Sequence, residues 1–317
     1  MENSREVILE IRGLRKWFPV SGSRGKKFVK AVNDVDLTLR RGETLGIVGE
    51  SGCGKSTLAR LTLRLLDATG GAVLYRGKNL MELSREELRE TRRHLQMIFQ
   101  DPYASLNPRQ TIGSILCEPF LIHKICGAKE AAERAKGLLR MVELPEESMK
   151  KFPHEFSGGQ RQRICIARAM AVMPEIIICD ECVSALDVSI QAQIINMLRR
   201  LQREYGLTLI FISHDLRVVR HISDRVAVMY LGEVVECAEK ETLYKSPAHP
   251  YSRALLSAVP VADPTLPPQR IRLNGEIPSP IDRPSGCAFR TRCPAADGRR
   301  AAEAPAAALV GARHVRR

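Results

Sequence analysis

The glycine-rich segment at residues 49–57, GESGCGKST, constrains the fold more than any other part of the chain. It fits the pattern G-x-x-x-x-G-K-[ST], which is typical of a loop whose backbone N–H groups wrap the phosphates of a nucleotide. We expect Lys55 to reach the β- and γ-phosphates and the Ser56 hydroxyl to bind Mg²⁺. The residues predicted to contact the phosphates are Gly49, Glu50, Ser51, Gly52, Cys53, Gly54, Lys55, Ser56 and Thr57.

The flanks of this segment supply the strand and the helix that the pattern requires. Residues 44–48, TLGIV, form a short apolar run that predicts a buried parallel strand. Beyond the loop, leucines recur at helical spacing, at Leu58, Leu61, Leu65 and Leu66. The alternative, a glycine-rich turn with a surface lysine, does not account for these flanks.

Length and composition indicate an ordinary globular protein. At 317 residues the chain is long enough for about two domains. Its apolar runs are far shorter than the roughly 18 residues of a membrane helix, and residues 1–13 are too charged for a signal peptide. We therefore expect a cytosolic protein, or one that rests on a membrane through partners.

The net charge of +13 raises the question of a nucleic-acid partner. Part of this charge lies in an arginine-rich stretch near the C-terminal end, which is more simply explained as a solvated segment. Aromatic residues make up only 5% of the chain, so platforms for base stacking are few, and no nucleic-acid-binding module is recognisable. We predict no nucleic-acid partner.

The nine cysteines argue against a disulfide framework, because no secretion signal accompanies them. Cys179 and Cys182 form a C-x-x-C that could be a redox pair. They flank Asp180 and Glu181 after an apolar run, which favours buried packing instead.

Residues 7–48 alternate apolar and polar side chains, which predicts an antiparallel β region ahead of the phosphate segment. Phe18 lies within this region, beside Trp17 and in front of a basic loop. It could stack on an adenine ring or simply pack, and its spacing does not decide between the two.

A carboxylate pair follows the buried strand predicted at residues 176–179. Open α/β sheets place their chemistry at the carboxyl ends of strands. Asp180 can hold Mg²⁺, and Glu181 can act as general base for an attacking water. A purely structural pair would be a poor explanation beside a phosphate-binding segment.

Three further segments have a functional and a structural interpretation. Gln100, after a predicted strand, could bind a metal through its amide oxygen or serve as a polar end-cap. His214, after residues 207–213, could hydrogen-bond a γ-phosphate or be structural. The segment 157–160, SGGQ, begins a helix and could form a second anion-binding site at the helix N-terminus. Taken alone, the segment is more simply interpreted as an N-cap.

The rest of the chain divides into an inserted helical lobe and an extension. Residues 111–142 have helical periodicity, with Ala131, Ala135, Leu138, Leu139 and Val142 on one face. From residue 246 onward frequent prolines break any long element, so a loop-rich extension is expected.

Taken together, GESGCGKST, Gln100, FSGGQRQR, IIICDE, SALD and SHDL resemble the ATP-binding subunits of ABC transporters over roughly residues 7–245. The resemblance implies that Gln100 couples the nucleotide to membrane subunits and that Phe18 stacks on adenine. It also implies that Glu181 is the catalytic base, Asp180 its magnesium-binding neighbour, and His214 the switch histidine. Asp187 corresponds to the D-loop. Ser157, Gly158, Gly159 and Gln160 correspond to the signature that acts on the partner subunit's ATP.

Further stretches narrow the branch to the dipeptide/oligopeptide (and nickel) importers, and more closely to the second of their two paired ATPases. They include SLNPRQTIGSIL, SALDVSIQAQIINMLRRLQ and HPYSRALLSAVP. Two departures are Cys182, where the family usually has proline, and Cys165, where it commonly has glycine; we expect altered rigidity rather than lost chemistry. The family tail often carries four cysteines for an iron–sulfur cluster. Only Cys287 and Cys293 occur here, so we predict no stable cluster.

The resemblance implies an α/β P-loop NTPase (RecA-like) core with an antiparallel β subdomain, an inserted helical signature subdomain and a loop-rich C-terminal extension. We place the nucleotide-binding domain at residues 1–245, its helical subdomain at about 101–173, and the extension at 246–317, with a disordered end from Ala295. The implied cofactors are ATP and Mg²⁺.

The implied partners are a second homologous ATPase, two membrane permeases and, indirectly, an extracytoplasmic solute-binding protein, at the cytoplasmic face of the inner membrane. The alternative is a non-transport ATPase of the same kind, acting in DNA repair, on chromosomes or in translation. The DNA-repair and chromosome ATPases need a long coiled coil between residues 55 and 157, and the translation factors usually carry two cassettes in one chain. This sequence shows neither feature.

Overall fold

The computed structural model describes residues 6–20, 27–259, 270–303, 308–311 and 314–316. It divides into two compact units. Unit 1 contains Arg40–Glu43 and Glu82–Ile212, with Glu6; unit 2 contains Val7–Leu39, Thr44–Met81 and Ser213–Arg317. Within the described ranges, no helix has the length and apolar character needed to span a membrane.

Unit 2 begins with an antiparallel sheet, as the alternation of residues 7–48 predicts. Its strand order is β2-β1-β4-β5, with β1 at Val7–Pro19, β2 at Phe28–Arg40, β4 at Gly70–Tyr75 and β5 at Lys78–Asn79. The pairing of β1 with β4 places Ile11 opposite Val73, and both side chains are buried. Alternate residues therefore form the core face of this sheet.

A second group of strands in unit 2 positions the phosphate segment. Strand β3, Thr44–Val48, is buried along its whole length and pairs in parallel with β9, Arg225–Tyr230. Strand β9 forms a hairpin with β10, Glu233–Glu239, through Leu231 and Gly232, whose φ angles are 43° and 79°. The helices of this group are α1, Lys55–Thr62, α8, Leu216–Ile222, and α9, Lys240–Lys245.

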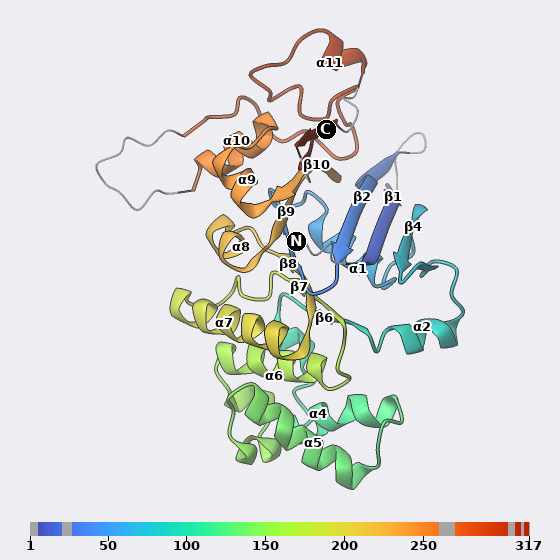
Figure 1. The fold of residues 1–317 in the computed structure, drawn as a ribbon, viewed down its shortest axis with the longest axis vertical. Coiled ribbons are helices and arrows are strands. Elements are labelled where there is room, and N and C mark those ends of the chain that lie inside the picture. Colours follow the sequence, from blue (N-terminus) through green and yellow to red (C-terminus); the bar gives the residue numbers. More distant parts are fainter. Residues whose placement is uncertain (1–5, 21–26, 260–269, 304–307, 312–313, 317) are drawn as a thin grey trace. The chain divides into compact units, whose positions relative to one another are not determined.

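Unit 1 is built on three parallel strands (Figure 1). These are β6, Leu95–Ile98, β7, Ile176–Asp180, and β8, Thr208–Ile212; β7 lies between the other two. Every residue of β7 and β8 is buried, which explains why they read as continuous apolar runs rather than alternating ones. The α/β fold class is confirmed.

The helices of unit 1 begin and end at the signals that the sequence carries. Helix α2, Arg85–Thr91, starts at the capping box of Ser84 and Glu87. Helix α7, Val188–Tyr205, ends at Gly206, whose φ is 65°. The lobe between β6 and β7 contains α3, Pro102–Ser105, α4, Ile112–Ile122, α5, Ala128–Met141, two 3₁₀ turns, Glu146–Lys150 and Pro153–Glu155, and α6, Gly158–Met170.

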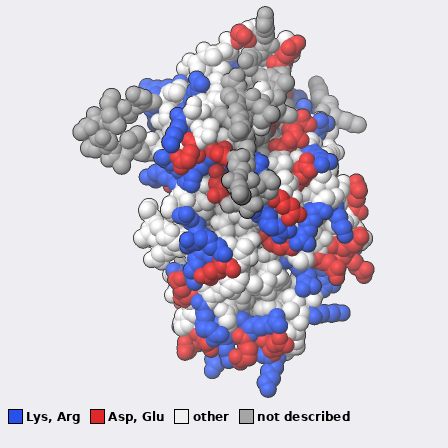
Figure 2. Space-filling view, viewed as in Figure 1, with Lys and Arg blue, Asp and Glu red and all other residues white. Residues whose placement is uncertain are grey.

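The predicted apolar face of α5 is buried against α4 and α6, and Ala131, Ala135 and Leu139 are each 0% exposed. The opposite face carries charge pairs, such as Arg134 with Glu130 at 2.7 Å. Figure 2 shows basic and acidic side chains interspersed over this lobe rather than gathered by sign.

The extension contains α10, Pro250–Ser257, and a short α11, Arg299–Ala302. Strands β11, Ala308–Gly311, and β12, His314–Arg316, pair with each other, and β12 also pairs with β10. They lie within the end that we expect to be disordered from Ala295, and that expectation stays a prediction. Residues 304–307, 312–313 and 317 lie outside the described part.

Candidate functional site

The phosphate loop, residues 49–57, lies between β3 and α1 of unit 2. Gly49 and Gly54 have φ angles of 153° and 104°, and a Cβ on either would lie 2.2 Å or 2.1 Å from a backbone carbonyl oxygen. Only glycine therefore satisfies both the backbone conformation and the available space. Gly54 is also the N-cap of α1 and has no side-chain cap. Among the described residues the N–H groups of Gly52 and Gly54 donate no hydrogen bond, which leaves them for a ligand.

Lys55 carries the strongest indication of an anionic ligand. Lys55 is only 5% exposed, and its ammonium donates to the carbonyl oxygens of Gly49 at 2.9 Å and Glu50 at 3.1 Å. Among the described residues no carboxylate forms an ion pair with it. A buried cation without a counter-charge is costly, and the phosphates of a nucleotide would supply that charge.

The C-terminal extension holds the first residues of this loop, a feature that the sequence analysis missed. The Glu50 N–H donates to the Tyr251 hydroxyl at 3.0 Å, and the Glu50 carboxylate accepts three hydrogen bonds from Arg292, the shortest at 2.9 Å. Burial raises the pKa of Tyr251, so its hydroxyl stays neutral. The side chain of Arg292 is 9% exposed. The stretch HPYSRALLSAVP, which contains Tyr251, marks the family in the sequence, but no nearby residue indicates that Tyr251 or Arg292 contacts the loop.

Two further predicted site residues lie in unit 2. Phe18 is half-buried near the end of β1, and the Lys16 ammonium lies 5.1 Å from its ring centroid. His214 is exposed and follows Ser213, whose N–H donates to the Ile47 carbonyl of β3 at 3.3 Å. This bond ties the histidine's backbone to the strand that precedes the phosphate loop.

Unit 1 brings Gln100 and Glu181 together. The Gln100 Nε2 donates to the Glu181 carboxylate at 3.1 Å, which leaves the amide oxygen of Gln100 for a cation. Glu181 has a φ of 47°, a left-handed conformation that costs a non-glycine residue about 1–2 kcal/mol. Its N–H donates to the Ile212 carbonyl at 3.0 Å and so holds this conformation. Asp180, the residue before it, ends β7 and is 3% exposed.

The signature turn, residues 157–160, forms the N-terminus of α6 in unit 1. Ser157 Oγ accepts from the Gln160 N–H at 3.4 Å, and Gln160 Oε1 accepts from the Ser157 N–H at 3.0 Å. The N-cap interpretation is confirmed, but the N–H groups of Gly158 and Gly159 donate to no described residue and stay available to an anion. A Cβ on Gly159 would lie 2.5 Å from Ile190 Cγ2. Asp187, the predicted D-loop residue, is exposed and forms the N-cap of α7.

The cysteines near these residues have a packing role. Cys179 and Cys182 are both buried and not disulfide-bonded. A hydrogen bond with Cys182, together with burial, raises the pKa of the Cys179 thiol, and burial raises the pKa of Cys165 to about 11. Neither thiol is therefore a reactive thiolate at neutral pH.

Comparison with known protein families decides the identity. Residues 32–184 match the ABC transporter family, and residues 235–299 match the oligopeptide/dipeptide transporter C-terminal region. The oligopeptide transport ATP-binding protein AppF of Bacillus subtilis (strain 168) is 54% identical over 92% of this chain and 91% of its own length. The chain belongs to the ABC transporter family. It is the ATP-binding, ATP-hydrolysing component of that family.

Two other ABC proteins support this assignment. The oligopeptide transport ATP-binding protein OppF of Escherichia coli (strain K12) is 54% identical over 92% of this chain and 90% of its own. The ATP-binding cassette MJ0796, in a dimeric post-hydrolysis structure bound to ADP and Pi, gives a TM-score of 0.66 at 30% identity. This match covers 73% of the chain and 98% of the cassette. The P-loop NTPase core expected of an ABC ATPase is thereby confirmed.

Proposed function

We propose that this ABC ATPase powers the uptake of dipeptides or oligopeptides, or of a related solute such as nickel, through membrane permeases. The observation that carries the nucleotide site is the buried Lys55 ammonium, which forms an ion pair with no carboxylate of the described residues and lies in a loop shaped by positive-φ glycines. The peptide branch is supported by the names of the relatives and by the C-terminal region that the chain shares with them.

We assign the chemistry to residues of both units. In unit 1, Glu181 accepts a proton from the water whose oxygen attacks the γ-phosphorus, while the bond to the bridging oxygen of ADP breaks. Ser56, Gln100 and Asp180 would supply oxygen ligands for Mg²⁺, and the bound ion would neutralise charge on the phosphates. His214 hydrogen-bonds the γ-phosphate, and Phe18 stacks on adenine.

The signature turn and Asp187 act on the ATP of a second, homologous ATPase subunit, so two nucleotides bind between paired subunits. Residues 1–245 serve as the nucleotide-binding domain, with a helical subdomain at about 101–173, and residues 246–317 as the extension. Two permeases and, through them, an extracytoplasmic solute-binding protein complete the assembly at the cytoplasmic face of the inner membrane.

The base is tested with Glu181→Gln. We expect this change to retain ATP binding and to lower ATP turnover by about 10²–10⁴-fold, since the amide cannot take the proton. Glu204→Gln, an exposed residue of α7 in the same unit, is the matched control and should turn over ATP normally. Undiminished turnover of the Glu181 variant would exclude this residue as the base.

The partner is tested by light scattering of the Glu181→Gln protein with ATP, alone and mixed with the ATPase encoded beside it. Dimerisation only in the mixture supports a heterodimeric importer. A tight homodimer without the second ATPase would contradict it.

An iron and sulfide assay of the purified chain should find no cluster, because only Cys287 and Cys293 of the tail are available; four irons per chain would overturn this.

A further inference from the structure

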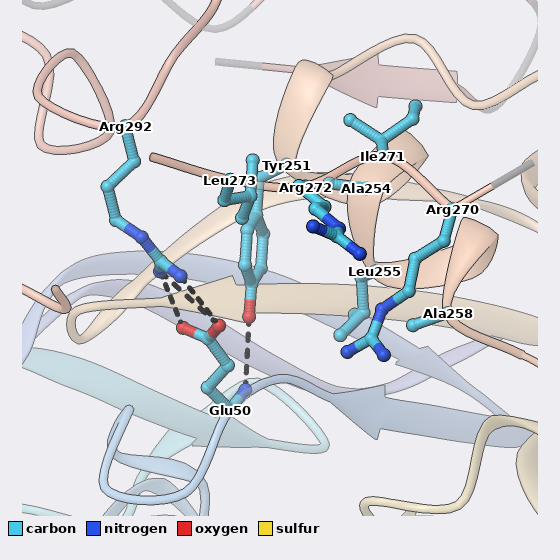
Figure 3. A pocket seen from close by; sticks show the side chains of 10 residues that line it. All are labelled: Glu50, Tyr251, Ala254, Leu255, Ala258, Arg270, Ile271, Arg272, Leu273 and Arg292. Carbon is cyan, nitrogen blue, oxygen red and sulfur yellow. Dashed lines mark hydrogen bonds and ion pairs between the residues drawn. The ribbon is translucent and has the colours of Figure 1, made fainter. Parts of the chain in front are cut away.

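A cavity of about 500 Å³ lies in unit 2 between α10 and the stretch that runs from Arg270 to Leu273. Figure 3 shows its lining side chains, with Tyr251 at the centre and Glu50 of the phosphate loop below it. The cavity has the size of a small-molecule site, for which about 300–1,000 Å³ is typical. None of the residues to which we assign ATP chemistry lines it, apart from Glu50.

The charges around this cavity are unbalanced. Its lining includes Arg270, Arg272 and Arg292 against the one acidic residue Glu50, an excess of two positive charges. Arg292 is paired with Glu50, at 2.9 Å between Nη1 and Oε2. No described side chain forms a hydrogen bond or ion pair with Arg270 or Arg272. In Figure 3 these two guanidinium groups lie on the opposite side of the Tyr251 ring from Arg292.

This arrangement fits a dianion of the phosphate class. Arginine presents a planar fork of donors that matches phosphate oxygens in bidentate hydrogen bonds, and two forks match the charge of a phosphomonoester. The remaining walls are apolar, formed by Ala254, Leu255, Ile271 and Leu273 beside the Tyr251 ring. An apolar wall next to a charged one suits an organic phosphate better than inorganic phosphate.

We propose that the cavity between α10 and residues 270–273 binds a small phosphorylated organic molecule, whose phosphate is held by Arg270 and Arg272. Of the phosphate loop, the lining includes Glu50, whose N–H donates to the Tyr251 hydroxyl, and none of the other residues at 49–57. A ligand there contacts the same tyrosine that holds the loop, so the cavity is placed to report the presence of such a molecule to the ATPase.

Calorimetric titration with phenyl phosphate tests this site once the phosphate loop can no longer compete. In the Lys55→Ala protein the phosphate loop is disabled; in a second preparation, used in case that variant does not fold, the loop of the wild-type protein is saturated with a non-hydrolysable ATP analogue. We expect one phenyl phosphate to bind per chain in each preparation. Inorganic phosphate should bind severalfold more weakly, since it leaves the apolar wall unused. Equal affinity for the two probes would overturn the organic part of the proposal.

The arginines are tested by adding Arg270→Gln and Arg272→Gln to both preparations. Affinity for phenyl phosphate should fall about tenfold or more, as expected when charge-assisted hydrogen bonds are lost. The matched control is Arg85→Gln with Arg109→Gln, two exposed arginines of unit 1 that have no described ion pair; affinity should then stay within about twofold. Absence of binding in both preparations, or equal losses in the two double variants, would exclude the site.

Discussion

The phosphate loop of unit 2 and the signature turn of unit 1 both place glycines at the start of a helix, but they use these glycines for different physical purposes. In the phosphate loop the glycines take positive φ angles, and helix α1 has no side-chain cap. In the signature turn Ser157 caps the helix with ordinary φ, and Gly159 provides clearance for Ile190. In both, glycine N–H groups donate to no residue of the described ranges, so an anion-binding site can be formed by backbone conformation or by close packing.

The largest effect is expected for Gly54→Ala. The new Cβ would lie 2.1 Å from the Ala31 carbonyl oxygen in a backbone at φ 104°, so we expect a loss of about 3 kcal/mol or more of unfolding free energy and loss of ATP binding. Urea denaturation and binding of a fluorescent ATP analogue measure the two effects. The control is Gly77→Ala, with φ 78° and no atom within 4 Å of the Cβ. Equal losses for the two variants would remove steric clearance from the explanation.

Gly159→Ala should cost about 1–3 kcal/mol of unfolding free energy, because the described atoms nearest to its Cβ belong to the Ile190 side chain, which can shift. Removing that side chain gives a direct test. The double variant with Ile190→Ala should be less destabilised than the sum of the single variants, as measured in urea. Additive losses would show that clearance is not the role of this glycine. A second substitution could not restore stability in this way at Gly54, because the atom that its Cβ would meet is the backbone carbonyl oxygen of Ala31.

Tyr251→Phe removes the acceptor of the Glu50 N–H and should cost about 1–2 kcal/mol of stability. Affinity for ATP should fall severalfold, because the loop loses a support from the extension. Tyr244→Phe is the matched control, since the Tyr244 hydroxyl donates to the Leu216 backbone carbonyl away from the loop. It should lose similar stability in urea but bind ATP normally; reduced ATP affinity in both variants would contradict a specific role for Tyr251.

The smallest effect is expected for Ser157→Ala, which removes the cap of α6 and should cost about 1 kcal/mol. Ser84→Ala removes an equivalent capping box from α2. Thermal melts should give matched losses. If the signature turn also binds an anion, ATP turnover in the assembled dimer should fall only for the Ser157 variant, and unchanged turnover there would limit the serine to a structural role.

Local features of the fold could be predicted because their causes lie within a few residues. The capping box of Ser84 and Glu87 and the helix end at Gly206 depend on neighbours in sequence. The buried face of α5 follows from apolar spacing. The pairing of β12 with β10 could not be predicted in this way, because a strand's partner depends on backbone groups far along the chain.

The site shows the same division. Its residue types were predictable from motifs, since a phosphate loop needs glycines, a lysine and a hydroxyl in a fixed local order. The hydrogen bond between Gln100 and Glu181 was not predictable, because it joins residues 81 positions apart. The left-handed backbone of Glu181 was also missed, since no glycine marks it.

The order of residues alone determines which chemical groups the chain can present: the glycine-lysine-serine loop, the carboxylate pair at the end of β7 and the capped signature helix. Only the tertiary structure decides that Tyr251 and Arg292, 201 and 242 residues from Glu50, hold that residue of the loop. Contacts at such separation are selected by the packing of the whole unit, which partly buries the Glu50 N–H and the Arg292 guanidinium and so favours a hydrogen-bond partner for each. The local sequence determines which functional groups are present, and the tertiary packing determines which of them come into contact.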